Sequence, residues 1–340
     1  MATIKDVAKL ADVSPSTVSI VAANKCAERK IPDATRDRVL KAMEILKYRP
    51  NRVARRLRSD EHSRPTIALY WPLDMRSHQI GRVLLGMQSE IEDYQSGCEV
   101  IVQPYTNNFL HKDPHLLKND FFDGIIIGAP SFEDTAYLES IQPLVPTIIY
   151  NRRVKNYNCV YADNEAAMSK LTSILSDRGY KSVGILTSNQ ELNNYLGMSA
   201  RKQVFIDYCR SAGIDVKASM IQGGDNTHLG GYEAIKNMYA TQRMSGMDIL
   251  FCNSDIMALG ACKALRELDI QIPQKLAVVS MGFLDEEFTK FANPSLSVLQ
   301  IPYEKMASEA TKWIKALLDH RTDETDLRCF DIDFLLRETF

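Results

Sequence analysis

Short apolar runs rich in β-branched residues recur from Thr66 to the C-terminus, and helical stretches separate them. Such alternation is typical of βαβ units, in which parallel strands form a sheet and helices cover both of its faces. About 275 residues of this pattern are too many for one sheet core, so we expect two doubly wound lobes. The chain should change lobes near 160–164 and return near 293–296. The runs cover residues 67–71, 100–105, 124–129, 147–151, 183–187, 248–252, 277–281 and 297–301.

The first 22 residues have another pattern, that of two short helices joined by a tight turn. Apolar residues at helical spacing form the buried stripe of the first helix, namely Ile4, Val7, Ala8 and Ala11. Ser14 is a good N-cap for the second helix, Pro15 fits its first position, and Val13 can pack on Val18 across the cap. The inward face of this helix is then formed by Val18, Val21 and Ala22. Its outward face carries Ser16, Thr17, Ser19 and Ile20. Exposed hydroxyls on such a helix suit a major groove, and an ordinary helical hairpin is the alternative.

The charge of the N-terminal segment supports the first alternative. Residues 1–64 hold 15 Lys and Arg against 8 Asp and Glu, a net charge of +7, whereas the whole chain carries −2. A basic head on an acidic body indicates that the head binds a polyanion. A third helix, capped by Asp33 after Pro32, should complete the head by packing its apolar residues Leu40, Met43 and Leu46 on the first two helices.

Residues 47–58 contain six cations and no acid. Pro50 ends the head, and Asn51 can cap a short helix whose apolar face is Val53, Ala54 and Leu57. A helix of this length does not hold alone in water, so we expect it to form on DNA beside a second copy of the chain. The polar residues 59–65 read as a linker.

Three segments of the head, 3–11, 14–19 and 48–54, closely resemble the lactose-repressor and purine-repressor family of bacterial transcription regulators (LacI/GalR). The resemblance implies that the hinge helix docks in the minor groove with Leu57 wedged between base steps; packing of Leu57 on the body is the alternative. It also implies which residues contact DNA: Thr3, Ser14, Pro15, Ser16, Thr17, Ser19, Ile20, Asn24, Tyr48, Asn51, Arg52, Ala54, Arg55 and Leu57.

The head departs from the family pattern at two positions. Ile20 stands where many members have an Arg that bonds a guanine edge, and it offers only apolar contact to a thymine methyl. Asn24 follows two alanines, Ala22 and Ala23, where the family usually has Leu-Asn-Gly. The operator should therefore differ from those of Arg-bearing members.

The resemblance extends to the body and gives the fold class. We expect an all-α helix-turn-helix head and an α/β body of two doubly wound parallel sheets, like that of periplasmic sugar-binding proteins. The predicted domains are a DNA-binding head (1–49), a hinge helix and linker (50–65) and an effector-binding and dimerisation body (66–340). The first lobe should span about 66–161 and 295–322, and the second about 162–294 and 323–340.

Ligands of open α/β sheets bind beyond the carboxyl ends of the strands, here between the lobes. The resemblance implies an effector site that draws on Gly128, Asp163, Arg201, Ser254, Asp255 and Asp285. Trp71 and Asn226 are further candidates for the cleft, and ordinary surface or packing is the alternative for each. For Asp255 the alternative is capping of the following helix, with Ser254 as the ligand contact. Leu284 stands where the family usually has an Asp that holds a sugar, and Gly128 where lactose-type members have an Asn, so the sequence does not name the effector.

Other classes of protein lack support in the sequence. The chain contains no phosphate-binding loop, zinc-protease helix or nucleophile elbow, and its seven cysteines lie singly. We therefore expect no catalytic residue, no metal and no cofactor. No apolar run approaches the roughly 18 residues that span a membrane, so a cytoplasmic protein is expected.

These features predict a homodimeric transcription regulator, most simply a repressor. Its partners should be double-stranded operator DNA, a second copy of itself and a sugar-like effector, with no membrane. Control by a partner protein instead of a small molecule is one alternative. A small-molecule receptor or an enzyme on the same scaffold is a more distant one.

Overall fold

The computed structural model describes residues 3–22, 26, 29, 31–46, 64–92, 97–113, 116, 122–189, 199–319 and 325–340. Contacts divide the chain into two compact units, residues 1–63 and 64–340, which are described separately below. The predicted hinge helix lies outside the described residues.

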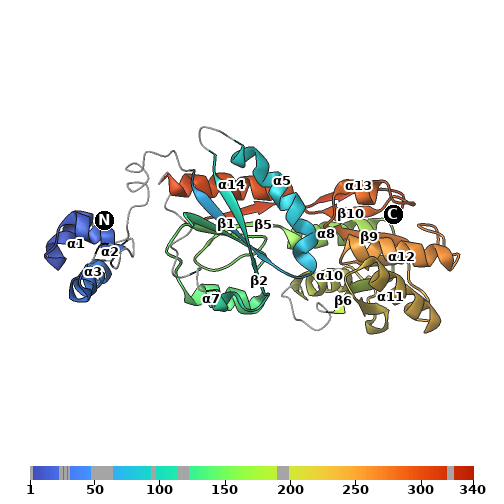
Figure 1. The fold of residues 1–340 in the computed structure, drawn as a ribbon. Coiled ribbons are helices and arrows are strands. Elements are labelled where there is room, and N and C mark those ends of the chain that lie inside the picture. The colour runs from blue at the N-terminus through green and yellow to red at the C-terminus, as the bar shows by residue number, and fades with distance from the viewer. Residues whose placement is uncertain are drawn as a thin grey trace. The chain divides into compact units, whose positions relative to one another are not determined.

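The described part of the head contains α1 (Ile4–Ala11), α2 (Pro15–Ala22) and α3 (Asp33–Ile45) (Figure 1). A reciprocal cap begins α1: the Thr3 hydroxyl accepts the N–H of Asp6, and the Asp6 carboxylate accepts the N–H of Thr3. The Ser14 hydroxyl accepts the N–H of Thr17 at 3.1 Å, so the predicted cap of α2 is confirmed. The helices enclose one small core, formed by Val7, Ala8, Ala11, Val18, Val21, Cys26, Val39 and Ala42.

The third helix differs from the prediction in two ways. Asp33 lies inside the first turn, where its carboxylate pairs with Arg36 at 2.8 Å, and the Pro32 carbonyl accepts the first backbone N–H. Leu40 is 47% exposed, whereas its neighbour Val39 is fully buried. Both residues fit a helical stripe, so the prediction for Leu40 was wrong, whereas Met43 and Leu46 pack against the core of the head as predicted.

The first lobe of the body is built on a parallel six-stranded sheet with the order β11-β5-β4-β3-β1-β2. Helix α7 (Phe132–Ser140) covers one face, and α5 (Ile80–Ile91) and α14 (Tyr303–Leu318) cover the other (Figure 1). Because both faces are covered, the central strands are apolar along their whole length. The strands are β1 (Thr66–Pro72), β2 (Glu99–Tyr105), β3 (Gly124–Gly128), β4 (Thr147–Tyr150), β5 (Asn158–Ala162) and β11 (Leu327–Phe330).

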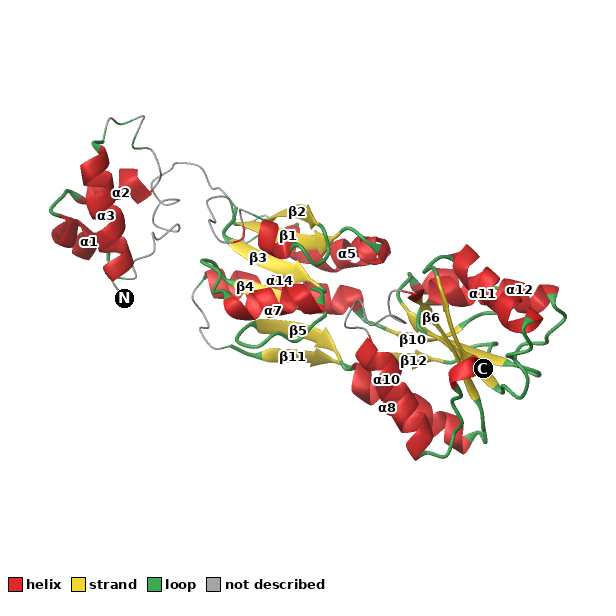
Figure 2. Cartoon of the chain, turned by 90° about the horizontal axis from the view of Figure 1, so that it is seen from below, coloured by secondary structure: helices red, strands yellow, loops and turns green. Residues whose placement is uncertain are grey.

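The second lobe has a six-stranded sheet with the order β12-β10-β9-β8-β6-β7, in which only the edge strand β12 is antiparallel. Helices α8 (Asn164–Asp177) and α10 (Ser199–Ser211) lie on one side, and α11 (His228–Ala240) and α12 (Asp255–Glu267) on the other (Figure 2). The strands are β6 (Val183–Ser188), β7 (Ile221–Gly224), β8 (Ile249–Cys252), β9 (Ala277–Gly282), β10 (Ser297–Gln300) and β12 (Asp333–Leu335).

The remaining described helices are short. A 3-10 helix, η1 (Met75–Gln79), leads into α5, and η2 (Leu110–Lys112) follows β2. In the second lobe η3 (Ala218–Met220) precedes β7, and α13 (Glu286–Lys290) follows β9.

The chain crosses between the lobes at places other than those predicted for the C-terminal part. The first change, near 160–164, does fall at the end of β5. However, β10 at 297–300 still belongs to the second sheet, and the return comes only with α14. The segment 327–330, expected in the second lobe, is β11 of the first sheet, where it pairs with β5. Pairing partners decide these positions, and hydrophobic patterning does not reveal them.

All eight predicted strands are present within one or two residues of their predicted bounds. Four described strands were not among the predicted runs. Strand β5 was expected only as the place where the chain changes lobes, and β7, β11 and β12 are only three or four residues long and contain Gly, Arg or Asp.

Candidate DNA-contacting face and inter-lobe site

The hydroxyls at the start of α2 have local partners. The Ser14 and Thr17 side-chain oxygens share a hydrogen bond of 2.9 Å, while Pro15 and Ser16 are exposed. Ser19 and Ile20 are half-buried on the same helix. The predicted contacts Asn24, Tyr48, Asn51, Arg52, Ala54, Arg55 and Leu57 lie outside the described residues. The described face thus presents small hydroxyls and one apolar side chain, Ile20.

In the body, Arg201 joins three elements of the second lobe. Its guanidinium donates to Asn164 Oδ1 at 2.7 Å and to Asn253 Oδ1 at 3.3 Å, and it lies 5.7 Å from the centre of the Phe283 ring. Asn164 is the first residue of α8, while Asn253 and Phe283 follow β8 and β9. Arg201 is 6% exposed, so its cation is held at the carboxyl edge of the second sheet.

Asp255, another predicted effector residue, is fully buried, and its carboxylate forms hydrogen bonds with backbone N–H groups. Its carboxylate accepts the N–H groups of Phe283 at 2.9 Å, Leu284 at 2.8 Å and Ile256 at 3.0 Å. Burial raises the pKa of this carboxyl to about 6, and the three N–H donors act in the opposite direction. Asp255 therefore fixes the loop after β9.

Two other predicted carboxylates cap helices. Asp163 accepts the N–H of Ala166 at 2.9 Å and begins α8. Asp285 accepts the N–H of Glu287 at 3.0 Å and begins α13, where it is exposed. Capping employs one oxygen of each carboxylate, so both positions are set by local structure.

Several buried polar atoms lack hydrogen-bond partners among the described residues. They include the hydroxyls of Ser254 and Tyr303 and the side-chain oxygens of Asn226 and Gln300. Ser254 precedes α12 without capping it, and Tyr303 is the first residue of α14. Sequence reasoning missed Tyr303 because only the structure shows that its hydroxyl is buried without a hydrogen-bond partner among the described residues. Such groups are what a ligand can satisfy.

Trp71 and Gly128, predicted as effector contacts, lie against each other. A Cβ atom on Gly128 would stand 2.4 Å from the Trp71 ring, so only glycine leaves room for the indole. The indole N–H donates to the Arg76 carbonyl at 3.1 Å, and the ring lies 6.2 Å from that of Tyr150. The Trp71 ring thus fills the space that a side chain at position 128 would need.

Arg82 of α5 connects the two lobes. It pairs with Glu304 of α14 at 2.5 and 2.6 Å, and it also donates to the carbonyls of Leu284 at 3.1 Å and Ile301 at 3.2 Å. Leu284 belongs to the loop that Asp255 holds. The Arg82 cation also lies 5.1 Å from the centre of the Tyr303 ring. The inter-lobe region is therefore a connected set of charged and aromatic groups.

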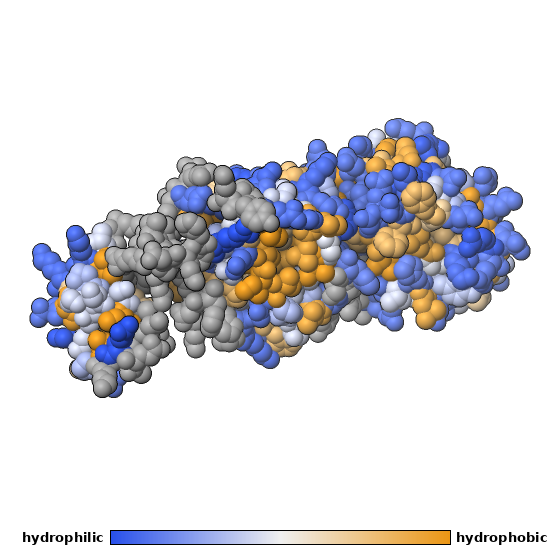
Figure 3. All heavy atoms as spheres, turned by 45° about the horizontal axis from the view of Figure 1, so that its top comes forward, coloured by the Kyte–Doolittle hydropathy of each residue, from blue (hydrophilic) through white to orange (hydrophobic). Residues whose placement is uncertain are grey.

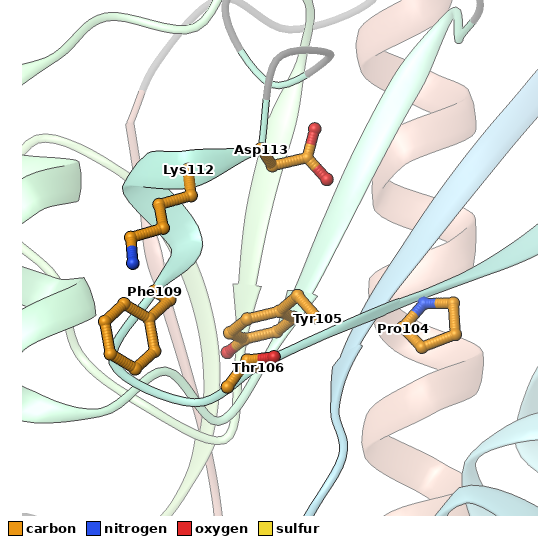
Figure 4. Close-up of a pocket in the computed structure, with 6 residues that line it drawn as sticks. All are labelled: Pro104, Tyr105, Thr106, Phe109, Lys112 and Asp113. Atoms are coloured by element: carbon orange, nitrogen blue, oxygen red, sulfur yellow. The ribbon is translucent and has the colours of Figure 1, made fainter.

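A separate hollow of about 470 Å³ lies at the carboxyl end of β2 (Figure 4). The Lys112 ammonium stands 4.0 Å from the centre of the Phe109 ring, and the Tyr70 hydroxyl donates to Asp113 at 3.4 Å. Its lining residues all come from the segment 104–113 of the first lobe, so this hollow does not join the lobes.

Neither a metal centre nor a membrane span is found in the part of the chain that the structure describes. Its His, Cys, Asp and Glu side chains form no group of three or more that fits a metal ion. None of its helices is long and apolar enough to cross a bilayer.

A head whose described residues form three helices, on one chain with a two-sheet α/β body, is the organisation of DNA-binding transcription regulators. Residues 3–51 match the model of bacterial regulatory proteins of the lacI family, and residues 172–336 match that of a periplasmic binding protein-like domain. The chain is 26% identical over 335 residues to the regulator GalS of Salmonella typhimurium, covering 97% of this chain and 94% of that protein.

Solved structures agree with these matches. A LacI family transcription regulator from Clostridium acetobutylicum is 31% identical with a TM-score of 0.75, covering 81% of this chain and 100% of that one. The lac repressor dimer bound to operator and the anti-inducer ONPF is 20% identical with a TM-score of 0.69, and the match covers 99% of this chain and 98% of that one. The chain belongs to the LacI family, and it is a DNA-binding transcriptional regulator rather than an enzyme.

Proposed function

We propose that this regulator binds operator DNA as a homodimer, most simply as a repressor, and that a sugar-like effector between the lobes of the body controls its affinity for DNA. The observation that carries the proposal is the capped α2, which presents Ser16 and Ile20 on one chain with a two-lobed body. The lac repressor dimer, which shares the fold, is bound to operator and an anti-inducer. Two heads in successive major grooves would read a pseudo-palindromic site.

Exposed apolar side chains on the body support a second copy as partner. Ile101 and Val102 are 46% and 36% exposed on β2, and Leu85 on α5 is 59% exposed. Strand β2 is an edge of the first sheet, and an exposed apolar edge invites pairing or cover. Figure 3 shows apolar surface gathered in patches on the body. A subunit of the same chain would cover this edge.

The effector site is supported by the groups that converge between the lobes. Arg201, Ser254 and Tyr303 come from different elements, and the two hydroxyls are buried without partners among the described residues. A ligand that accepts hydrogen bonds from them would contact both lobes, because Tyr303 begins α14 of the first lobe. Its binding would favour one arrangement of the lobes and so change DNA affinity.

The test is selection of duplexes from a random pool by the full-length protein, followed by anisotropy titration of the selected and a scrambled duplex. We expect a pseudo-palindromic sequence bound by two chains per duplex. If three cations per subunit reach phosphates, six contacts imply a loss of about a thousandfold in affinity between roughly 50 and 200 mM salt. Equal affinity for the scrambled duplex, or an affinity that barely changes with salt, contradicts the proposal.

A further inference from the structure

We propose that Arg82 is a latch between the two lobes of the body. Its hydrogen bonds to the loop after β9 favour one arrangement of the lobes, and they thereby set the affinity for operator DNA before any effector binds. The latch consists of the Arg82 guanidinium and the carbonyl oxygens of Phe283 and Leu284. It rests on the proposed function, in which the arrangement of the lobes controls DNA binding, and adds the residue that biases this arrangement.

The first-lobe side of the latch is rigid. Helices α5 and α14 pack so closely at Gly86 that a Cβ atom there would stand 2.2 Å from the Glu304 carbonyl oxygen. An ion pair of Lys315 with Glu90, at 3.2 Å, joins the same two helices further along. The buried Arg82 guanidinium forms two hydrogen bonds with the Glu304 carboxylate, at 2.5 and 2.6 Å. Arg82 therefore moves with the first lobe.

The second-lobe side of the latch is held by its own core. Asp255, the first residue of α12, accepts the N–H groups of Phe283 at 2.9 Å and of Leu284 at 2.8 Å. The peptide group between Phe283 and Leu284 thus donates to an anion of the second lobe while its carbonyl accepts from a cation of the first lobe. Hydrogen bonds in such a chain polarise and strengthen one another. The loop therefore moves with the second lobe and meets Arg82 at its carbonyls.

The latch can open without leaving a buried charge unpaired. The Arg82 guanidinium lies 3.4 and 3.1 Å from the carbonyls of Phe283 and Leu284, farther than from the Glu304 carboxylate. If the lobes move apart at this point, Arg82 stays paired with Glu304 and the loop stays bonded to Asp255. Removing one partner of a buried ion pair is strongly unfavourable, whereas opening the latch loses hydrogen bonds to neutral carbonyls. A ligand that prefers the open arrangement can overcome such a contact.

Two variants separate the latch from the packing of its helices. Arg82→Lys keeps a cation for Glu304, but a single ammonium lacks the fork of N–H donors that reaches the two carbonyls as well. Lys315→Gln is the matched control, because it breaks an ion pair between the same two helices within the first lobe. Melting temperatures show that both full-length variants are folded.

The arrangement of the lobes is measured by the distance between two spin labels. Cys329 of the first lobe is exposed while the other six cysteines are buried, so it provides one labelling site. Tyr239→Cys on α11 of the second lobe, where the side chain is 51% exposed, provides the other. Exchange with an excess of unlabelled subunits restricts the signal to distances within one chain. We expect Arg82→Lys to shift or broaden the distance distribution and Lys315→Gln to leave it unchanged. An unchanged distribution in Arg82→Lys overturns the proposal.

The affinity for the selected duplex tests the coupling to DNA binding. Arg82→Lys should change this affinity by about fivefold or more, the size of a typical allosteric coupling, whereas Lys315→Gln should bind as wild type does. If Arg82→Lys changes the distance between the labels but not the affinity, or if both variants change the affinity equally, the bridge is only structural and the proposal is wrong.

Failure of the proposed function has another signature. The wild-type protein then binds the selected and the scrambled duplex equally, which also removes the operator part of the latch proposal. The label distances do not depend on DNA, so they still show whether Arg82 holds the lobes together.

Discussion

At the scale of single residues, several identities are explained by one close contact. Gly128 is the clearest, because the Trp71 ring occupies the place of its Cβ. Gly81 of α5 is the opposite case, since a Cβ there meets no atom within 4 Å. The two glycines therefore make opposite predictions for the same substitution.

Gly128→Ala should destabilise the body because the Trp71 ring must shift in a packed core. Overpacking of this kind costs about 1–3 kcal/mol, which corresponds to a fall in melting temperature of several degrees, about 2–4 °C per kcal/mol. Gly81→Ala lies in a helix with free space and should leave the melting temperature unchanged or raise it. Calorimetry of both variants checks this. A Gly128→Ala protein as stable as wild type would show that the indole does not fill that space.

Asp255 predicts a dependence of stability on pH. Its pKa is raised to about 6 in the folded protein from the ordinary 3.8, so folding takes up a proton between these values. Stability from this group is therefore lowest above pH 6 and rises as the pH falls toward 4, by about 1.4 kcal/mol per pH unit at most. Urea unfolding of wild type and Asp255→Asn at pH 7.5, 6 and 5 isolates the effect. The stability of wild type relative to the variant should increase toward pH 5, and the reverse slope contradicts the assignment.

At the scale of elements, sequence patterning predicted most strands but not their partners. Runs such as Gly124–Gly128 and Val183–Ser188 are fully buried and read as strands by composition alone. The C-terminal strands β11 and β12 are short, and which sheet each joins depends on backbone pairing over long sequence distances. The cap at Ser14 is local, so it could be predicted from the sequence, whereas the reciprocal cap at Thr3 was not predicted.

The bridge between α5 and the loop after β9 predicts a stability effect. Arg82→Gln removes a cation that is 9% exposed and leaves the Glu304 carboxylate without its partner. We expect a loss of about 2–4 kcal/mol, somewhat less than for a fully buried pair, because Glu304 is partly exposed. Lys263→Gln breaks the exposed pair with Glu267 and is the control, with no resolvable change expected. Urea unfolding of both variants distinguishes the bridge from surface charge.

At the scale of the whole molecule, the proposed effector site is where the residues predicted from the sequence differ most from those that the structure points to. The resemblance pointed to Asp163, Asp255 and Asp285, yet the structure employs these carboxylates in caps and in holding a loop. Tyr303 gave no signal in the sequence, because its burial depends on how α14 returns to the first lobe. The sequence shows which polar residues are present. It does not show whether their hydrogen-bond donors and acceptors are already used by contacts within the protein.

The proposed dimer makes a prediction that only the assembled protein can meet. Ile101→Glu places a charge on the exposed edge strand β2, and burying it against a second copy is strongly unfavourable. The mass in solution should fall from that of a dimer toward the 38.4 kDa of one chain. Affinity for the selected duplex should fall with it, because one head makes only half of the phosphate contacts.

Leu327→Glu provides the matched control, since Leu327 is 44% exposed on β11 at the opposite edge of the same sheet. It should change neither the mass nor the affinity. Analytical ultracentrifugation and anisotropy titration on both variants separate an effect of the β2 edge from a general effect of surface charge. If Leu327→Glu dissociates the dimer while Ile101→Glu does not, the subunits meet at the other edge of the sheet, and the assignment of β2 to the interface fails.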